Sequence, residues 1–363
     1  MYKKLSEKNK KNGKVNSNII NIIIIALLFI GLIVYMFYVD DIETIVQVIK
    51  NMKYDWLFVG LMCMVIYWLL EAACLYVVTK KTYTNEKFST TLRVSMIGQL
   101  FNCITPFSSG GQPIQAVAMI NDGKKLSNSV SILLIKFIVY QATLVIYTLL
   151  LIVFKYAYFK SLINNFIYLA LIGFLVNLAV IVFLLLIGIN QKLVYNGIKW
   201  IYNILEKVKI LKNVDERLKH LQHGLTNFHD QFKIIQKEKI MILKLVIFAV
   251  IQLTVFFFVT YAIYRAFRQS GTSIINIISA QAFLMMIMAF IPLPGAGIAA
   301  EGGFFVIFST FFKSETINMA VLIWRIYTFY LPIVVGALFM VINNKKSDKK
   351  IKLDTKGVDI NDI

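Results

Sequence analysis

The chain has 363 residues, of which 58% are hydrophobic, and carries a formal net charge of +19. Its apolar share is above that of typical soluble domains. Several apolar runs reach the ~20 residues needed to cross a bilayer core, so we predict an all-α, polytopic membrane helix bundle. The basic residues gather at the ends of these runs, which indicates loops facing anionic lipid and argues against nucleic acid as a partner.

The first part of the chain predicts a basic tail and two spans. Residues 1–18 are polar and rich in lysine, and we expect them to form a cytoplasmic tail. A first span is predicted at 19–39, and a loop at 40–55 has more acidic than basic residues. The second span, at 56–78, ends at two lysines. The excess of positive charge on cytoplasmic loops then places 40–55 outside.

A break in the apolar sequence follows the second span. The pieces at 91–104 and 114–120 are each too short to cross alone, and residues 105–115 between them read TPFSSGGQPIQ. Backbone broken by proline and glycine leaves polar groups that lipid cannot satisfy, so it persists only within protein or beside a watery cavity. We predict a re-entrant hairpin that starts from the cytoplasmic side.

The middle of the chain predicts three spans around one polar stretch. The spans lie at 129–154, 166–189 and 242–264, and the polar stretch lies at 190–240. Two interpretations of that stretch stay open: an amphipathic helix on the cytoplasmic surface, or an ordinary loop helix that covers the bundle. Both rest on apolar residues at helical spacing, namely Val208, Leu211, Val214, Leu218 and Leu221.

A second break mirrors the first one. Residues 272–312 are apolar but interrupted at 292–303 by PLPGAGIAAEGG, and a last span at 318–342 precedes a polar tail at 344–363. The two breaks together hold four of the five prolines. We therefore expect one membrane domain over 19–343, with six full spans and two re-entrant hairpins that start from opposite sides. That arrangement is typical of an inverted repeat with a transport site between its halves.

The first break has the composition of an anion site. Gly110 and Gly111 allow positive φ and close backbone approach, and Pro113 suits the first position of a helix. A half-helix over 113–121 would point its free N–H groups into the membrane and favour an anion such as a lipid phosphate. Gln112 and Gln115 would add donors. The competing interpretation is a structural kink with satisfied amides.

The second break adds a carboxylate, Glu301, and a charge at membrane depth needs a partner. Arg325 in the last span is the nearest candidate. The pair would either contact a lipid headgroup and carry protons, or brace the hairpin against the last span. The expected substrate-binding residues of both breaks are Thr105, Gly110, Gly111, Gln112, Pro113, Gln115, Pro294, Gly295, Gly297, Glu301, Arg325 and Tyr330.

Two other charges lie within predicted spans. Glu71 is as consistent with a cavity-facing role as with a structural one, and Lys136 lies near enough to a helix end that we expect it to snorkel.

The histidines and cysteines show no metal-ligand spacing. We find no nucleotide-binding loop and no hydrolase or dinucleotide signature. The sequence therefore predicts no catalytic residue, cofactor or metal.

Three motifs occur in order along the chain: Thr105-Pro106 with Gly110-Gly111-Gln112-Pro113, then Pro292-x-Pro294-Gly295 with Glu301-Gly302, then Trp324-Arg325 with Tyr330-Leu331-Pro332. Together they resemble the lysylphosphatidylglycerol synthase transmembrane-region family, the flippase-like membrane part of the bacterial multiple peptide resistance factor. The resemblance covers about residues 20–343. Ala296 stands where relatives often have glycine, which affects only the expected hairpin shape.

The resemblance implies movement of aminoacylated phosphatidylglycerol to the outer leaflet of a bacterial cell membrane, where its charge repels cationic antimicrobial peptides. Bifunctional members carry a C-terminal synthase domain that uses lysyl-tRNA, and the short tail here leaves no room for one. We therefore expect a lipid flippase with both termini in the cytoplasm, as a monomer or an oligomer. Two alternatives stay open: a phosphatidylglycerol lysyltransferase, as the family name implies, and a membrane subunit that docks a separate lipid synthase through residues 190–240.

Overall fold

The structure is a computed structural model that describes residues 42–162, 166–207, 214–288, 291 and 293–341. These residues form helices and no strand. Five of the described helices are long and apolar enough to cross a membrane: Tyr54–Thr82, Leu126–Phe154, Leu171–Ile189, Lys239–Ala266 and Ser314–Val341. They confirm five of the six predicted spans. The sixth, at 19–39, and both predicted tails lie outside the described residues.

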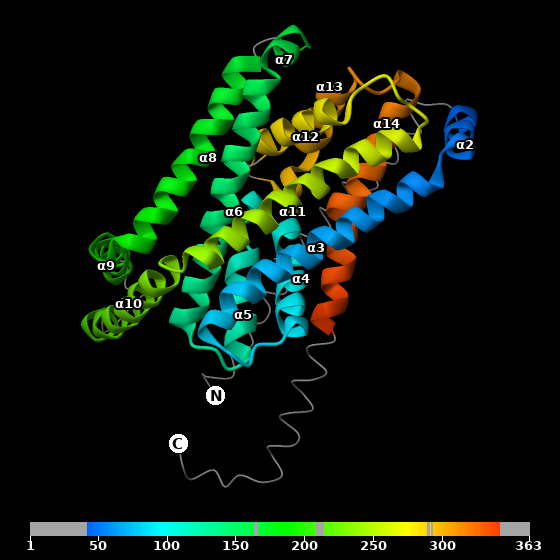
Figure 1. Cartoon of the computed structure of the whole chain (residues 1–363). Helices are drawn as coiled ribbons and strands as arrows, with labels where there is room; N and C mark the ends of the chain where they lie inside the picture. The colour runs from blue at the N-terminus through cyan, green and yellow to red at the C-terminus, as the bar shows by residue number, and fades with distance from the viewer. Residues whose placement is uncertain (1–41, 163–165, 208–213, 289–290, 292, 342–363) are drawn as a thin grey trace, which may run out of the picture.

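The first half of the bundle starts at the upper end of Figure 1, runs down, folds back to the centre and then crosses upward. The centre is reached by two short helices joined by a link that contains a three-residue 3-10 turn, and this unit is the predicted first hairpin. In chain order the elements are α2 (Ile42–Asn51), α3 (Tyr54–Thr82), α4 (Phe88–Ile104), η1 (Pro106–Ser108), α5 (Gly111–Asn121) and α6 (Leu126–Phe154).

The second half repeats this order in the opposite direction (Figure 1). Its elements are α11 (Lys239–Ala266), α12 (Ile274–Met288), η2 (Pro294–Ala296), α13 (Gly297–Phe308) and α14 (Ser314–Arg325), which continues through a π-helical stretch, η3 (Ile326–Tyr330), to Val341. The five elements from α11 to α14 start between 185 and 188 residues after their counterparts from α3 to α6. The regular offset and the reversed direction are those of an inverted repeat.

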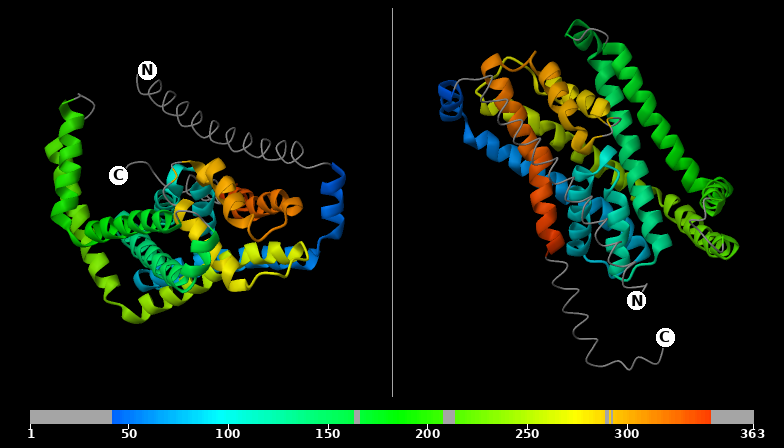
Figure 2. Two further views of the ribbon diagram at one scale, coloured as in Figure 1. Left: turned by 90° about the horizontal axis from the view of Figure 1, so that it is seen from above. Right: turned by 180° about the vertical axis from the view of Figure 1, so that it is seen from behind.

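A further helical segment links the two halves. It contains α7 (Tyr156–Leu162), α8 (Phe166–Ile189), α9 (Gln191–Lys207) and α10 (Val214–Gln236). α8 lies beside α6 and α12, whereas α9 and α10 extend to one side at the lower end of the bundle (Figures 1 and 2). The predicted polar stretch 190–240 is thus two helices.

The packing of α9 and α10 can be compared with the two interpretations of the polar stretch. α10 packs on α6, and its Phe228 and Phe232 are buried in one cluster with Leu75 and Ile132 of the bundle. α10 is therefore a loop helix that covers the bundle. α9 keeps an exposed apolar face. Of the residues that suggested the periodicity, Leu218 is buried, while Val208 and Leu211 lie outside the described residues.

Close contacts between the halves bring the hairpins together. α3 and α11 lie side by side along much of their length. Gly60 of α3 permits the close approach of the last span, because a Cβ there would meet the Tyr327 ring at 2.9 Å. The Tyr327 hydroxyl donates to the Leu57 carbonyl at 2.9 Å. Gly336 of the last span likewise lies against α4, where a Cβ would be 2.6 Å from the Met96 carbonyl oxygen. Small residues at helix contacts are the usual means of close association in lipid.

Candidate functional site

The two proline-glycine breaks adopt the same backbone turn and touch each other in the middle of the bundle. Thr105 (φ −114°, ψ 147°) and Leu293 (φ −118°, ψ 148°) are both extended before their proline. The residue after each proline, Phe107 or Gly295, then has φ of 55° or 56°. A second left-handed residue follows in each break, Ser108 (φ 52°) or Ala296 (φ 58°). Left-handed φ is costly for residues other than glycine and often marks functional sites.

The first break is closed by side chains of its own hairpin. The Gly110 N–H donates to Thr105 Oγ1 at 2.8 Å, and the Gly111 N–H donates to Asn102 Oδ1 at 3.0 Å. Both glycines are needed for close approach, because a Cβ on Gly111 would lie 2.0 Å from Asn102 Oδ1. Gly110 and Gly111 do not use the positive φ that glycine allows, since the left-handed residues here are Phe107 and Ser108.

The half-helix that follows the first break begins earlier than predicted. It starts at Gly111, so Pro113 is its third residue instead of its first. Two amides near its N-terminus are already bonded within the protein, as described above, and proline has no N–H to offer. Gln115 is only 3% exposed and lies against Gly98 of α4, where a Cβ would be 2.2 Å from Gln115 Nε2. Gln112 is half-buried and Pro113 is exposed.

The second break is fastened by the last span. Arg325 Nε donates to Glu301 Oε1 at 3.2 Å, so the pair expected from the sequence is formed. The same guanidinium donates from Nη1 to the Gly295 carbonyl at 3.0 Å and from Nη2 to the Gly297 carbonyl at 2.6 Å. Arg325 is 3% exposed, and a buried arginine with a planar fork of donors suits several acceptors at once. Its position favours the bracing interpretation of this pair.

A π-helical stretch begins next to the second break. Ile326–Tyr330 is π-helical, and Pro332, which lacks an N–H and crowds the preceding turn, lies two residues further on. π-turns commonly absorb such an interruption. The wider turn brings Phe329 against Gly295, where a Cβ would lie 2.1 Å from the Phe329 ring. Tyr330 is half-buried and meets the Phe329 ring edge to face.

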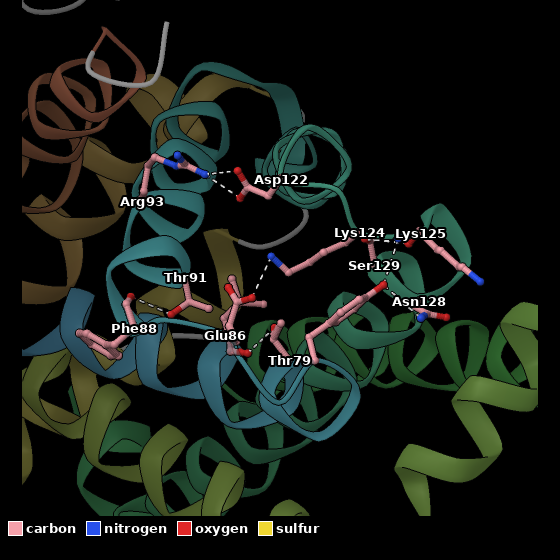
Figure 3. Close-up of polar contacts among 12 residues, drawn as sticks. Thr79, Glu86, Phe88, Thr91, Arg93, Asp122, Lys124, Lys125, Asn128 and Ser129 are labelled. Carbon is pink, nitrogen blue, oxygen red and sulfur yellow. Dashed lines mark hydrogen bonds and ion pairs between the residues drawn. The ribbon is translucent and has the colours of Figure 1, made fainter. Parts of the chain in front are cut away.

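The base of the first hairpin is clamped at the lower end of the bundle (Figure 3). Arg93 of α4 pairs with Asp122 after α5, and Lys124 Nζ lies 2.9 Å from Glu86 Oε2. The side chains of Lys124 and Glu86 are 6% and 7% exposed. A polar cavity of about 360 Å³ adjoins them. These ion pairs tie α4 and the loop before it to the loop after α5, so they hold the two legs of the hairpin together.

A further buried ion pair joins α3 and α6, and Gln252 links it to α11. Lys136 Nζ donates to Glu71 Oε1, and Gln252 Nε2 donates to Glu71 Oε2 at 3.0 Å. The Lys136 side chain is 7% exposed. The prediction that Lys136 snorkels was wrong, because Lys136 lies about three turns inside α6. The role of Gln252 was not predicted, and an amide within an apolar span was its only signal.

The other polar candidates have structural surroundings. Both ring nitrogens of His229 face carbonyl oxygens, those of Leu225 at 2.8 Å and Ile187 at 3.1 Å. The three cysteines are buried and reduced. Among the described residues, no group of three His, Cys, Asp or Glu side chains is placed to hold a metal ion. Asn102 is the site residue that the sequence did not reveal, and its only signal was an amide one turn before the first break.

Comparison with known proteins agrees with this architecture. No curated protein matches the chain. The family model described as "Lysylphosphatidylglycerol synthase TM region" matches residues 19–336, which include both breaks and every residue of the site. The chain therefore belongs to the lysylphosphatidylglycerol synthase transmembrane-region family, a lipid-related family of membrane proteins.

Proposed function

We propose that this protein moves a phospholipid between the two leaflets, with anionic or aminoacylated phosphatidylglycerol as its substrate class. The observation that carries the proposal is the meeting of two turns that begin with the same backbone conformation, from hairpins that start at opposite ends, beside an ion pair whose arginine is buried. Irregular backbone at membrane depth is tolerated only inside protein or beside a cavity. In transporters built from inverted repeats, such broken helices form the substrate site.

The inverted arrangement supports a movement between two states. Two halves with the same fold in opposite directions can each adopt the conformation of the other, which exposes a central site to each leaflet in turn. The headgroup would pass between the breaks while the acyl chains stay in the bilayer. No nucleotide signature occurs in the sequence, so the proposed movement is driven by protons or runs downhill.

The residues divide into two proposed roles. Thr105, Gly110, Gly111 and Gln115 shape the first break, and Pro294, Gly295, Gly297 and Arg325 shape the second, because their contacts are made within the protein. Gln112, Glu301 and Tyr330 are the proposed headgroup contacts. Each retains partial exposure, and the Glu301 side chain is 15% exposed. A carboxylate there suits a cationic headgroup.

The charge distribution supports an orientation in a bacterial cell membrane. Lysines are dense at the lower end of Figure 1, on the loops around the first hairpin and on α9. The excess of positive charge on cytoplasmic loops would place that end inside. In this orientation the first hairpin opens toward the cytoplasm and the second toward the outside. Outward movement of an aminoacylated lipid would also make the surface less attractive to cationic antimicrobial peptides.

The direct test measures lipid movement by the purified full chain in proteoliposomes. Lysyl-phosphatidylglycerol labelled with a fluorophore on its acyl chain is bleached by dithionite from outside, and the bleached fraction reports how much lipid exchanges between leaflets. We expect faster exchange than in empty liposomes, a loss of at least tenfold in Glu301→Gln and a smaller loss in Gln112→Ala. The matched control is Glu315→Gln, because Glu315 is an exposed carboxylate outside the breaks. Equal rates in Glu301→Gln and the control would contradict the proposal.

A second measurement separates transport from synthesis. Mass spectrometry of total lipids would compare a host that lacks aminoacylated lipids with and without this protein. We expect no new lipid. A new lysyl- or alanyl-phosphatidylglycerol would assign the lysyltransferase activity to this chain instead. No effect in either experiment would favour a subunit that docks a separate synthase.

A further inference from the structure

Helix α9 has a broader apolar surface than its neighbours cover. It contacts α8 and α10, and the side chains on one part of its apolar arc, such as Val194 and Ile198, are half-buried. The rest of the arc is open. Its exposed residues follow helical spacing along one face: Leu193 (42%), Trp200 (67%), Ile201 (48%) and Ile204 (40%).

The opposite face of α9 is polar and basic. At 100° per residue, Lys192, Asn196, Lys199 and Asn203 fall within one arc, which lies opposite the centre of the whole apolar arc and borders its exposed part at Trp200. All four are exposed. An exposed tryptophan on the apolar face, with lysines on the other, is the pattern of helices that lie in the headgroup region of a membrane.

The chain places α9 at the level of the bilayer surface. α8 is a span that ends at Ile189, and α9 begins two residues later. Asn190 makes the turn, since its Oδ1 accepts from the Leu193 N–H at 3.0 Å. Figure 1 shows α9 almost end-on at the lower end of α8, so its axis lies across the span. A helix tethered in this way runs along the surface.

We propose that α9 is an interfacial helix that binds the anionic leaflet at the lower end of the bundle. Its apolar residues lie among the parts of the acyl chains nearest the headgroups, and its lysines contact the anionic headgroups. The lysines favour an anionic lipid surface as the occupant of this face over a second copy of the chain, because the lysines of two neighbouring α9 helices would repel each other. The inference goes beyond lipid transport. It makes anionic lipid the partner that fixes the segment linking the two halves of the molecule.

The test measures the depth of two neighbouring positions by spin labelling. Ile201→Cys carries the label on the exposed apolar face, and Asn203→Cys carries it on the polar face as the matched control. The native cysteines Cys63, Cys74 and Cys103 are buried and stay unlabelled in a brief reaction. The full chain is placed in nanodiscs of phosphatidylcholine alone and of equal parts phosphatidylcholine and phosphatidylglycerol. Collision rates with oxygen and with a water-soluble nickel chelate are then measured.

We expect the ratio of oxygen collisions to nickel collisions to be several-fold higher at position 201 than at position 203. This ratio at position 201 should rise further when the nanodisc contains phosphatidylglycerol. Replacing Lys192 and Lys199 by glutamine should abolish that gain with the anionic lipid. Equal nickel access at both positions would show α9 in water and overturn the proposal. Dipolar broadening between labels at 201 would assign the face to a second copy and overturn it as well. Insertion that ignores lipid charge would overturn the anionic preference. Both labelled positions are exposed, so neither substitution is expected to unfold the protein.

Discussion

The first break is closed from within its own hairpin, whereas the second break depends on a helix that follows it in the chain. Thr105 and Asn102 bond Gly110 and Gly111 across no more than nine residues. In contrast, Arg325 reaches the Gly295 and Gly297 carbonyls from 28 to 30 residues away. The same turn is therefore self-contained in one half and externally held in the other.

This difference indicates which parts of the molecule can move together. The first hairpin can keep its shape as a rigid unit, because its bonds move with it. The second hairpin must follow the last span, since Arg325 and Phe329 both hold it there. In a molecule with two conformations, the last span and the second hairpin would then move together against the first hairpin. Hinge and shear motions are commonly carried by such units.

The largest effect is expected from Arg325→Ala. It removes three hydrogen bonds to the second break and leaves the Glu301 carboxylate, whose side chain is 15% exposed, without its partner. Losing one member of a buried ion pair costs about 3–5 kcal/mol. Titration with sodium dodecyl sulfate in mixed micelles, followed by circular dichroism, would measure this loss of stability. Arg325→Lys should recover only part of it, because one ammonium cannot make the same three contacts.

A control for that measurement is Lys313→Ala, which removes an exposed cation just before the last span. We expect less than about 0.5 kcal/mol from it, as for most surface substitutions. If Arg325→Ala were as stable as this control, the second break would not depend on the last span. The comparison between the two breaks would then fail.

A smaller loss is expected from Gly295→Ala. The new Cβ would lie 2.1 Å from the Phe329 ring, and the residue has a φ of 56°. Overpacking costs about 1–3 kcal/mol, and the left-handed backbone adds about 1–2 kcal/mol. The matched control is Gly302→Ala in α13, where a Cβ would meet nothing within 4 Å. That control should be neutral or slightly stabilising, because alanine favours helix. The same detergent titration compares the two.

Much of this arrangement could be predicted because lipid cannot satisfy free backbone polar groups or unpaired charges. Four prolines in two places within apolar sequence could only mean interrupted helices, and both hairpins are present. The pairing of Glu301 with Arg325 followed from the need of any buried charge for a partner. Each inference used a local composition that membranes seldom tolerate.

What could not be predicted depends on tertiary contacts. The Glu71–Lys136 pair forms because α3 and α6 bring the two residues together, and neither sequence neighbourhood reveals that meeting. The amide of Asn102 serves a backbone N–H nine residues later, which depends on the path of the turn. The start of α5 at Gly111 has the same cause: Asn102 bonds the Gly111 N–H, so the helix begins before Pro113.

The smallest effect on stability is expected in the first break, where Asn102 and Gly111 are substituted singly and then together. Asn102→Ala leaves the Gly111 N–H without its acceptor and should cost about 1–3 kcal/mol. Gly111→Ala alone should cost a similar amount, because the three atoms nearest its Cβ would all belong to the Asn102 side chain, the closest at 2.0 Å. In the double variant the alanine at 102 removes the atoms with which the new Cβ collides. We therefore expect the double variant to be more stable than the sum of the single losses predicts, by about 0.5–3 kcal/mol. Additive losses would mean that Gly111 is required by some other contact, and that the first break is not closed by its own hairpin.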